Sequence, residues 1–252
     1  MSSPAVSSPT RPTAPPSSQP ARFRRTVAGC ALVLGPVLFA AAELSGPELT
    51  GSSAHQVAQL AAHRGQQVVS SLLSIATAMV LLIGVLGAVH LVRRRGLVAA
   101  HLAAALSVYG LVAAHAALGG VNLVFAELGT PGLDRTAMVD LYDTVTHSAI
   151  GSPLLLGHFA LVVGLLLLGV SLWRAGVGPR WAAVCVVLYP VSDVLLSVVP
   201  ASEVADVVSN GFGIVGLGAL GLHVLRMADA AWDARTGQGA RTGQGAATAE
   251  RS

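Results

Sequence analysis

Six long apolar runs dominate this sequence, and they constrain its fold more than any other feature. They cover about residues 26–45, 68–92, 97–118, 153–173, 181–199 and 207–227. A helix needs roughly 20 apolar residues to cross the hydrocarbon core of a bilayer. The core holds no water to satisfy an open backbone, and the alternation typical of a membrane β-barrel is missing. The sequence therefore predicts an all-α, polytopic membrane bundle of six transmembrane helices.

Charge is scarce outside a few short segments. Charged residues make up 11% of the chain and apolar residues 53%, whereas soluble domains carry about 25% charge. These values exclude an ordinary soluble domain and disorder of the whole chain. The arginines lie at the edges of the apolar runs, so we expect the lipid bilayer as partner and no nucleic acid. A membrane-protein partner or a second copy of the chain is the further candidate.

The two ends of the chain differ in composition from the middle. Residues 1–21 are rich in proline and serine, and residues 231–252 contain the sequence ARTGQG twice. Such segments bury too little apolar area to fold, so we predict a disordered tail at each end. The transmembrane domain is then 22–230.

The distribution of arginine predicts the orientation of the bundle. Of the 15 basic residues, all of which are arginine, only Arg64 and Arg135 fall on one side of the six predicted spans. Arginine is retained on the cytoplasmic side of membranes. We therefore expect a multi-pass protein of a bacterial inner membrane with both termini in the cytoplasm.

The two longer outer loops contain helical patterns. Residues 52–66 predict a short interfacial helix, with Ser52 or Ser53 as its N-cap. Residues 133–149 predict an amphipathic helix. Its predicted apolar face holds Leu133, Met138, Leu141, Tyr142 and Val145, and its polar face holds Asp140, Asp143 and His147.

Asp193 is the foremost candidate for a functional side chain, because ionisable groups inside a membrane are costly. Cys185, Tyr189, Asp193 and Ser197 recur every four residues and share one helix face. Asp193 either binds a ligand or proton, or it joins two helices by hydrogen bonds. With Tyr189 and Asp193, three outer-half residues complete the predicted ligand or proton site: Glu43, His115 and His158.

Two histidines of the third run suggest a cofactor. His101 and His115 are fourteen residues apart, which places them on one face of a regular α-helix about 21 Å apart. This spacing resembles the paired axial ligands of membrane b-type cytochromes, and the resemblance implies haem b near each surface. His158 or His147 would then pair with His115, and His90 or His223 with His101.

Two other readings of these histidines stay open. They form hydrogen bonds with neighbouring helices, or they contribute to a divalent-metal site. Asp143 and His147 are four residues apart and therefore neighbours on their helix. Imidazole with carboxylate suits zinc or a similar ion.

The last apolar run is dense in glycine: Gly211, Gly213, Gly216, Gly218 and Gly221. Small residues let membrane helices approach one another closely. We therefore expect this helix to pack tightly inside the bundle.

Residues 24–228 resemble the small six-helix integral membrane proteins of actinomycete-type bacteria that are grouped as domains of unknown function. The shared features are Ala62-His63-Arg64-Gly65, Arg93-Arg94-Arg95-Gly96 and a long third hairpin loop. The resemblance implies a six-helix bundle in the cell membrane and no catalytic residue.

Three functions follow as hypotheses from these patterns. The first is a non-catalytic membrane protein that binds a small ligand or a partner helix in an outer-half polar cavity. The second is a haem- or metal-containing redox protein that uses His101, His115 and His158. The third is a small proton-coupled transporter with Asp193 as the proton carrier.

Overall fold

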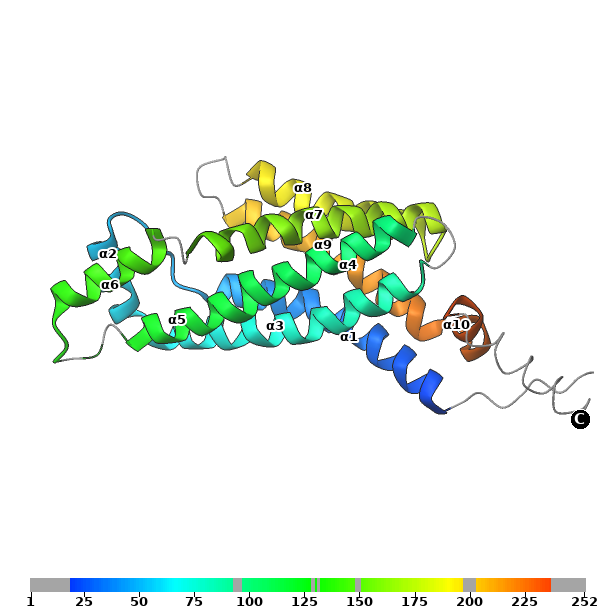
Figure 1. Cartoon of the computed structure of the whole chain (residues 1–252), viewed down its shortest axis with the longest axis horizontal. Helices are drawn as coiled ribbons and strands as arrows, with labels where there is room; N and C mark the ends of the chain where they lie inside the picture. Colours follow the sequence, from blue (N-terminus) through cyan, green and yellow to red (C-terminus); the bar gives the residue numbers. More distant parts are fainter. Residues whose placement is uncertain are drawn as a thin grey trace, which may run out of the picture.

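The computed structural model describes residues 19–92, 97–127, 130, 132–147, 151–196 and 203–236. Within these ranges every regular element is a helix (Figure 1). In chain order they are α1 (Gln19–Ser45), α2 (Ser53–Ala62), α3 (Arg64–His90), α4 (Leu97–Gly110), the π-helix η1 (Leu111–Ala117), α5 (Leu118–Glu127), α6 (Arg135–His147), α7 (Gly151–Ala175), α8 (Arg180–Leu196), α9 (Glu203–Arg226) and α10 (Asp229–Thr236).

Five helices are long and apolar enough to cross a membrane. They are Gln19–Ser45, Arg64–His90, Val98–Glu127, Leu156–Ala175 and Val207–Arg226. The third of these combines α4, η1 and α5 into one continuous rod. The described part of α8 has 17 residues, which is about 26 Å of helix and short of a full crossing. The sixth span, predicted at 181–199, therefore stays a prediction, and residues 197–199 lie outside the described residues.

The outward surface of the bundle is apolar, as a membrane environment requires. Met79 is 65% exposed and Val124 60% exposed, and many other large aliphatic side chains also face outward. Polar side chains lie inside instead, and Thr77 and Ser107 are fully buried. A soluble protein rarely exposes so much contiguous apolar surface. This inverted distribution agrees with the five apolar helices in indicating a multi-pass membrane protein.

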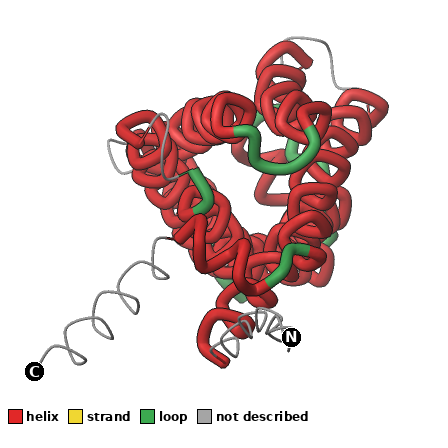
Figure 2. Tube along the Cα trace, turned by 90° about the vertical axis from the view of Figure 1, so that its right-hand side faces the viewer, coloured by secondary structure: helices red, strands yellow, loops and turns green. Residues whose placement is uncertain are grey.

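The long helices pack in a closed ring (Figure 2). Helix α1 packs against α3 on one side and α9 on the other, and α8 lies between α9 and α7. The rod formed by α4, η1 and α5 closes the ring, because α4 packs on α7 while α5 packs on α3. Helices α2 and α6 lie at one end of the bundle, and α10 lies at the other end together with the start of α1 (Figure 1).

Glycines allow the helices of the ring to touch. A Cβ atom at Gly221 would lie 2.7 Å from the backbone oxygen of Gly29 in α1, and one at Gly216 would lie 2.8 Å from the backbone nitrogen of Val186 in α8. These distances show that α9 packs tightly against both of its neighbours in the ring, α1 and α8. The expectation holds for only part of the glycine series, however, since a Cβ at Gly211 or Gly218 would meet nothing within 4 Å.

Helix α10 extends the ordered structure past residue 230, where we predicted the second tail to begin. Its Trp232 is 2% exposed, and its Asp229 forms an ion pair with Arg25 of α1 at 3.0 Å. Arg25 Nη1 also donates to the backbone oxygen of Leu225 at 2.7 Å and to that of Met227. Arg25 thus satisfies carbonyls at the end of α9, which otherwise lack intrahelical partners.

The helix boundaries differ from the predicted ones at two further places. Helix α1 begins at Gln19, inside the predicted first tail. Helix α2 ends at Ala62 and α3 begins at Arg64, so the predicted helix 52–66 is divided at His63. The remaining residues of both predicted tails lie outside the described residues.

Candidate ligand-binding site

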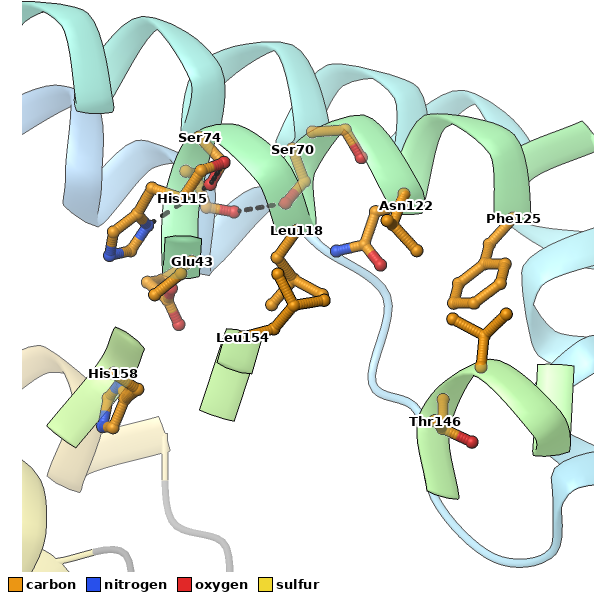
Figure 3. A pocket seen from close by; sticks show the side chains of 15 residues that line it. Glu43, Ser70, Ser74, His115, Leu118, Asn122, Phe125, Thr146, Leu154 and His158 are labelled. Atoms are coloured by element: carbon orange, nitrogen blue, oxygen red, sulfur yellow. Dashed lines mark hydrogen bonds between the residues drawn. The ribbon is translucent and has the colours of Figure 1, made fainter. Parts of the chain in front are cut away.

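A cavity of about 420 Å³ lies in the half of the bundle next to α2 and α6. Helices α1, α3, η1, α5, α6 and α7 all contribute side chains to it (Figure 3). Its polar lining residues are Glu43, Ser70, Ser71, Ser74, His115, Asn122, Thr146 and His158. The apolar lining includes Leu118, Val121, Phe125 and Leu154. Small-molecule sites usually have this mixture of surfaces and a volume of roughly 300–1,000 Å³.

The cavity lies beyond a close contact between two helices of the ring. A Cβ atom at Gly110, the last residue of α4, would lie 2.6 Å from the backbone nitrogen of Leu161 in α7. The rod then changes from α-helix to the π-helix η1, and its last part, α5, packs on α3 instead. Ala114 and His115 of η1 line the cavity. Single π turns are frequent at functional sites, and here η1 lines the cavity while it still packs on α7, since a Cβ at Gly157 would lie 3.0 Å from the backbone nitrogen of Ala114.

His115 lies at the inner wall of the cavity and is 7% exposed. Its Nδ1 atom is 3.3 Å from the hydroxyl oxygen of Ser74, which also donates to the backbone oxygen of His115 at 3.2 Å. The ring of Phe39 meets the imidazole edge to face, with centroids 4.8 Å apart. The second ring nitrogen, Nε2, is buried and has no hydrogen-bond partner among the described residues. A buried polar atom without a partner costs about 1–3 kcal/mol, so this nitrogen requires an explanation.

His158 connects the cavity to Asp193. His158 lines the cavity from α7, and its Nε2 atom lies 3.2 Å from the carboxylate of Asp193 in α8. Tyr189, one turn before Asp193, is buried and its ring packs edge to face on Phe39 with centroids 5.8 Å apart. The structure therefore brings together four of the five predicted ligand or proton residues through direct contacts or through Phe39, and Glu43 lines the same cavity. Ser197 lies outside the described residues.

The two histidines of the third span lie in different surroundings. His101 is exposed whereas His115 is buried, and η1 begins between them. Turns of a π-helix contain more residues than α turns, so the shared face expected from α periodicity does not extend across η1. His90, a proposed second ligand for His101, lies beside Trp232 with ring centroids 6.3 Å apart. His101 and His115 therefore do not share one regular α-helical face, and the haem hypothesis stays a prediction.

The predicted metal pair, Asp143 and His147, has no third ligand beside it among the described residues. No group of three or more His, Cys, Asp or Glu side chains suited to a metal ion occurs within the described ranges. Asp143 and His147 do form the expected neighbouring pair, at 3.2 Å, but they lie exposed on α6. Two exposed ligands leave a zinc ion short of its usual four.

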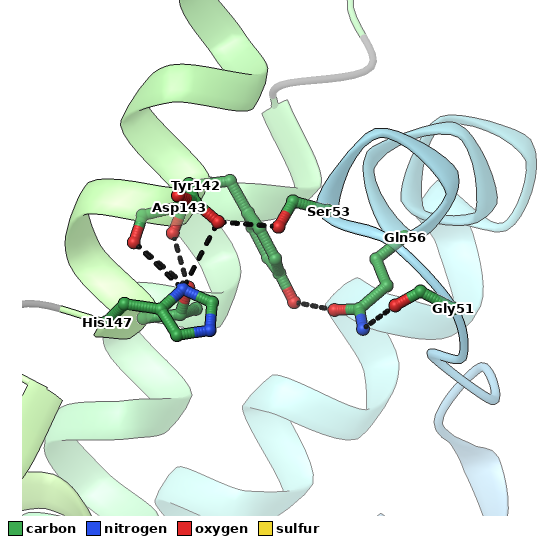
Figure 4. A network of polar contacts seen from close by, with 7 residues as sticks. Gly51, Ser53, Gln56, Tyr142, Asp143 and His147 are labelled. Carbon is green, nitrogen blue, oxygen red and sulfur yellow. Dashed lines mark hydrogen bonds and ion pairs between the residues drawn. The ribbon is translucent and has the colours of Figure 1, made fainter.

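Helices α2 and α6 form a polar clasp beside the cavity (Figure 4). The hydroxyl of Tyr142 donates to Gln56 at 2.5 Å, and Ser53 donates to Asp143 at 2.7 Å. Burial raises the pKa of the Tyr142 phenol above its usual value of 10.0, so the phenol keeps its proton at neutral pH and remains a donor. The clasp holds α6 where its Val145 and Thr146 line the cavity.

The apolar face of α6 differs from the predicted one. Tyr142 is buried together with Val57, Leu60 and Phe125, and Met138 and Val145 pack against this small core. Leu141, however, is 47% exposed, and Leu133 is also exposed. Both were assigned to the apolar face. The face of α6 that packs on this core holds Met138, Tyr142 and Val145. It is therefore narrower than the predicted apolar face.

Several cavity residues escaped the sequence analysis. Ser70, Ser71 and Ser74 lie in the second apolar run, and Thr146 lies in the loop helix. Ser70 and Ser74 are four residues apart, so they share a helix face, and that spacing was the available signal. Asn122 also lines the cavity, one α turn beyond Leu118. Serine is common in membrane helices, so such spacing alone identifies no site.

Comparison of this chain with protein-family models, with curated proteins and with solved structures found no match. The site's geometry is therefore the basis for any functional assignment.

Proposed function

We propose that this protein is a non-catalytic, multi-pass protein of a bacterial inner membrane that binds one small molecule in the cavity between α1, α3, α5 and α7. The observation that carries the proposal is the cavity itself, which combines polar and apolar side chains from six elements. The cavity is partly open, and its volume and mixed lining suit one small ligand.

The chemistry of the lining supports binding more than catalysis. The hydroxyl of Ser74 is bonded to His115, and His158 is bonded to Asp193. Nucleophilic catalysis needs a hydroxyl or thiol in contact with a base that is oriented by a third group. Ser74 contacts the Nδ1 atom of His115 at 3.3 Å, yet the other ring nitrogen has no described partner to orient it. This arrangement positions the imidazole and does not activate the serine.

A second candidate function is proton-coupled transport, which the contact between His158 and Asp193 favours. His158 faces the cavity on one side and the carboxylate of Asp193 on the other. Histidine and carboxylate chains inside membrane bundles are typical of proton relays. Proton movement between these two groups would couple the charge of Asp193 to the occupancy of the cavity.

The Asp193→Asn variant separates the two candidates. The amide is nearly isosteric and still accepts a hydrogen bond from His158, so we expect the fold and ligand binding to persist. Binding would be compared by calorimetry between about pH 5 and 8, the range in which histidine titrates. Equal pH dependence in both proteins supports simple binding, and loss of the pH dependence in the variant supports proton coupling.

The proposed orientation places both termini in the cytoplasm and α2 and α6 outside. The arginine distribution supports it, and the two described ends of the chain do lie at one end of the bundle (Figure 1). Reporter fusions after Gly46, Pro131 and Ala201 are expected to report the outside, and fusions after Arg95 and Gly176 the cytoplasm. A cytoplasmic signal after Gly46 would contradict this orientation.

Filling the cavity tests the proposed function. Val121 lines the cavity and Val124, on the same helix, is 60% exposed on the outer surface. We expect Val121→Trp to remove ligand binding and Val124→Trp to preserve it, because only the first indole occupies cavity volume. Native mass spectrometry of protein extracted from membranes would count small-molecule adducts.

The wild-type protein and Val124→Trp should carry an adduct of one small molecule per chain, which Val121→Trp should lack. The same adducts in both tryptophan variants would contradict the proposal. Thermal unfolding in detergent controls for damage to the fold, since both variants should unfold cooperatively.

A further inference from the structure

The cavity lies at the depth of the membrane-crossing helices. Val121 of α5 and His158 of α7 line it, and both belong to helices that are long and apolar enough to cross a membrane. On the outer surface of the same two helices, Val124 is 60% exposed and Phe159 is 52% exposed. Large apolar side chains on the outside of a membrane bundle contact lipid hydrocarbon. Lipid therefore surrounds the bundle beside this part of the cavity.

The wall of the cavity is weakest between α5 and α7. Helices α4 and η1 pack on α7, but α5 packs on α3 and α2. A Cβ atom at Gly119 of α5 would lie 3.1 Å from the backbone oxygen of Ser71 in α3. No comparable packing joins α5 to α7 within the described residues. Side chains alone therefore separate the cavity from the lipid on this side.

The end of the cavity next to α2 and α6 is better closed. Val145 and Thr146 of α6 line the cavity. One turn earlier, the ring of Tyr142 packs against that of Phe125 with centroids 4.8 Å apart. The Tyr142 hydroxyl donates to Gln56 of α2 at 2.5 Å. A molecule that enters from water at this end has to disrupt both the small apolar core and the clasp.

The charged groups of the lining already have interactions inside the protein. His158 contacts Asp193 at 3.2 Å, and Glu43 also has an interaction of its own. Neither arginine nor lysine occurs among the described lining residues. The lining therefore requires no charge on the ligand.

We propose that the ligand enters this cavity from the bilayer, between α5 and α7, and is an uncharged lipophilic molecule with one hydrogen-bonding group. This inference rests on the proposed ligand-binding function and specifies its route and ligand class. A charged molecule is costly to bring through hydrocarbon. Inside the cavity, the amide of Asn122 can donate and accept, and the hydroxyl of Ser70 can accept. The apolar body packs against Leu118 and Leu154.

Cysteine accessibility tests the route. Val121→Cys would be made in a chain whose two native cysteines, Cys30 and Cys185, are replaced by alanine. In lipid nanodiscs it would react with benzyl methanethiosulfonate, which is uncharged, and with the sulfonatoethyl and trimethylammonioethyl reagents, which carry opposite charges. Each rate is divided by that of Glu48→Cys, an exposed position outside the cavity. We expect the uncharged reagent to be more than about tenfold faster at Val121→Cys than either charged one.

Two controls complete this experiment. Val124→Cys, on the lipid-facing surface of α5, should show the same preference for the uncharged reagent. Adding Tyr142→Phe to Val121→Cys removes the hydroxyl of the clasp and retains the ring, so the labelling rates should stay unchanged. Equal relative rates of charged and uncharged reagents at Val121→Cys would overturn the route. Faster labelling by the charged reagents after Tyr142→Phe would overturn it as well, because it would show entry from water past α6.

The adduct carried by the wild-type protein tests the ligand class. Material released from the protein would be partitioned between octanol and water at neutral pH and weighed by mass spectrometry. We expect a small molecule in the octanol phase that is missing from Val121→Trp. A charged adduct that stays in water and is missing from Val121→Trp would overturn the ligand class, while the binding function would stand. A wild-type protein without any adduct would show that the binding function itself is wrong, whatever the labelling rates.

Discussion

Replacing Gly110 with valine is expected to destabilise the bundle by about 3 kcal/mol, the upper range for overpacking a dense interface. A Cβ atom at this position would lie 2.6 Å from both the backbone nitrogen and the Cβ of Leu161, and 2.7 Å from the backbone oxygen of Gly157. These are mostly backbone atoms, which cannot move aside as the end of a flexible side chain can. Helix α4 would have to move away from α7, which also carries Leu154 and His158 of the cavity lining.

Gly120→Val, on the same membrane-crossing rod, is the matched control. A Cβ atom at Gly120 would meet nothing within 4 Å, so the added side chain should be tolerated. Thermal unfolding in detergent, followed by circular dichroism, would compare the two variants with wild type. Equal unfolding temperatures for Gly110→Val and Gly120→Val would contradict the close packing of α4 on α7.

Arg25→Ala is expected to cost about 3 kcal/mol, the lower value for breaking a buried ion pair by removing one partner. Arg25 and Asp229 have side chains only 13% and 19% exposed. The variant removes the ion pair and two hydrogen bonds to carbonyls at the end of α9. It also leaves Asp229 without the arginine. Helix α10 should therefore separate from the bundle while the ring of long helices remains.

Limited proteolysis measures this separation. In Arg25→Ala we expect cleavage within residues 229–236 at protease levels that leave the wild-type protein intact. Arg22→Ala is the control, because Arg22 is exposed three residues earlier on the same helix. Resistance of the Arg25→Ala protein equal to that of wild type would show that α10 is held by Trp232 without help from the ion pair.

The apolar runs predicted the long helices well, since hydrophobic length alone decides whether a helix can cross a membrane. Five of the six predicted runs correspond to helices long and apolar enough to cross. The density of glycine in the last run also predicted close packing, which the structure shows at Gly216 and Gly221. It did not predict which helices are neighbours, because the ring places α1 between α3 and α9, and α9 is distant from both in the sequence.

The site was predictable only in part, for a reason seen in His115. The sequence predicted His115 as a site residue because it lies in an apolar run. Its surroundings depend on the π-helix η1, which no residue pattern predicted. The π turn changes the face on which His115 lies relative to His101, so regular α-helical spacing does not relate the two residues. The pairing of His158 with Asp193 depends on α7 lying beside α8. The clasp between Tyr142 and Gln56 joins residues 86 positions apart, and sequence spacing carries no information about such a contact.

The central claim is that the cavity between α1, α3, α5 and α7 holds one small molecule. An experimental structure of the protein purified with its native lipids tests this claim most directly. We expect density for one small molecule in the cavity, with a polar group within hydrogen-bonding distance of Ser70, Ser74 or Asn122 and an apolar part beside Phe125. A cavity closed by the protein's own side chains, or filled by a lipid acyl chain, would contradict the claim.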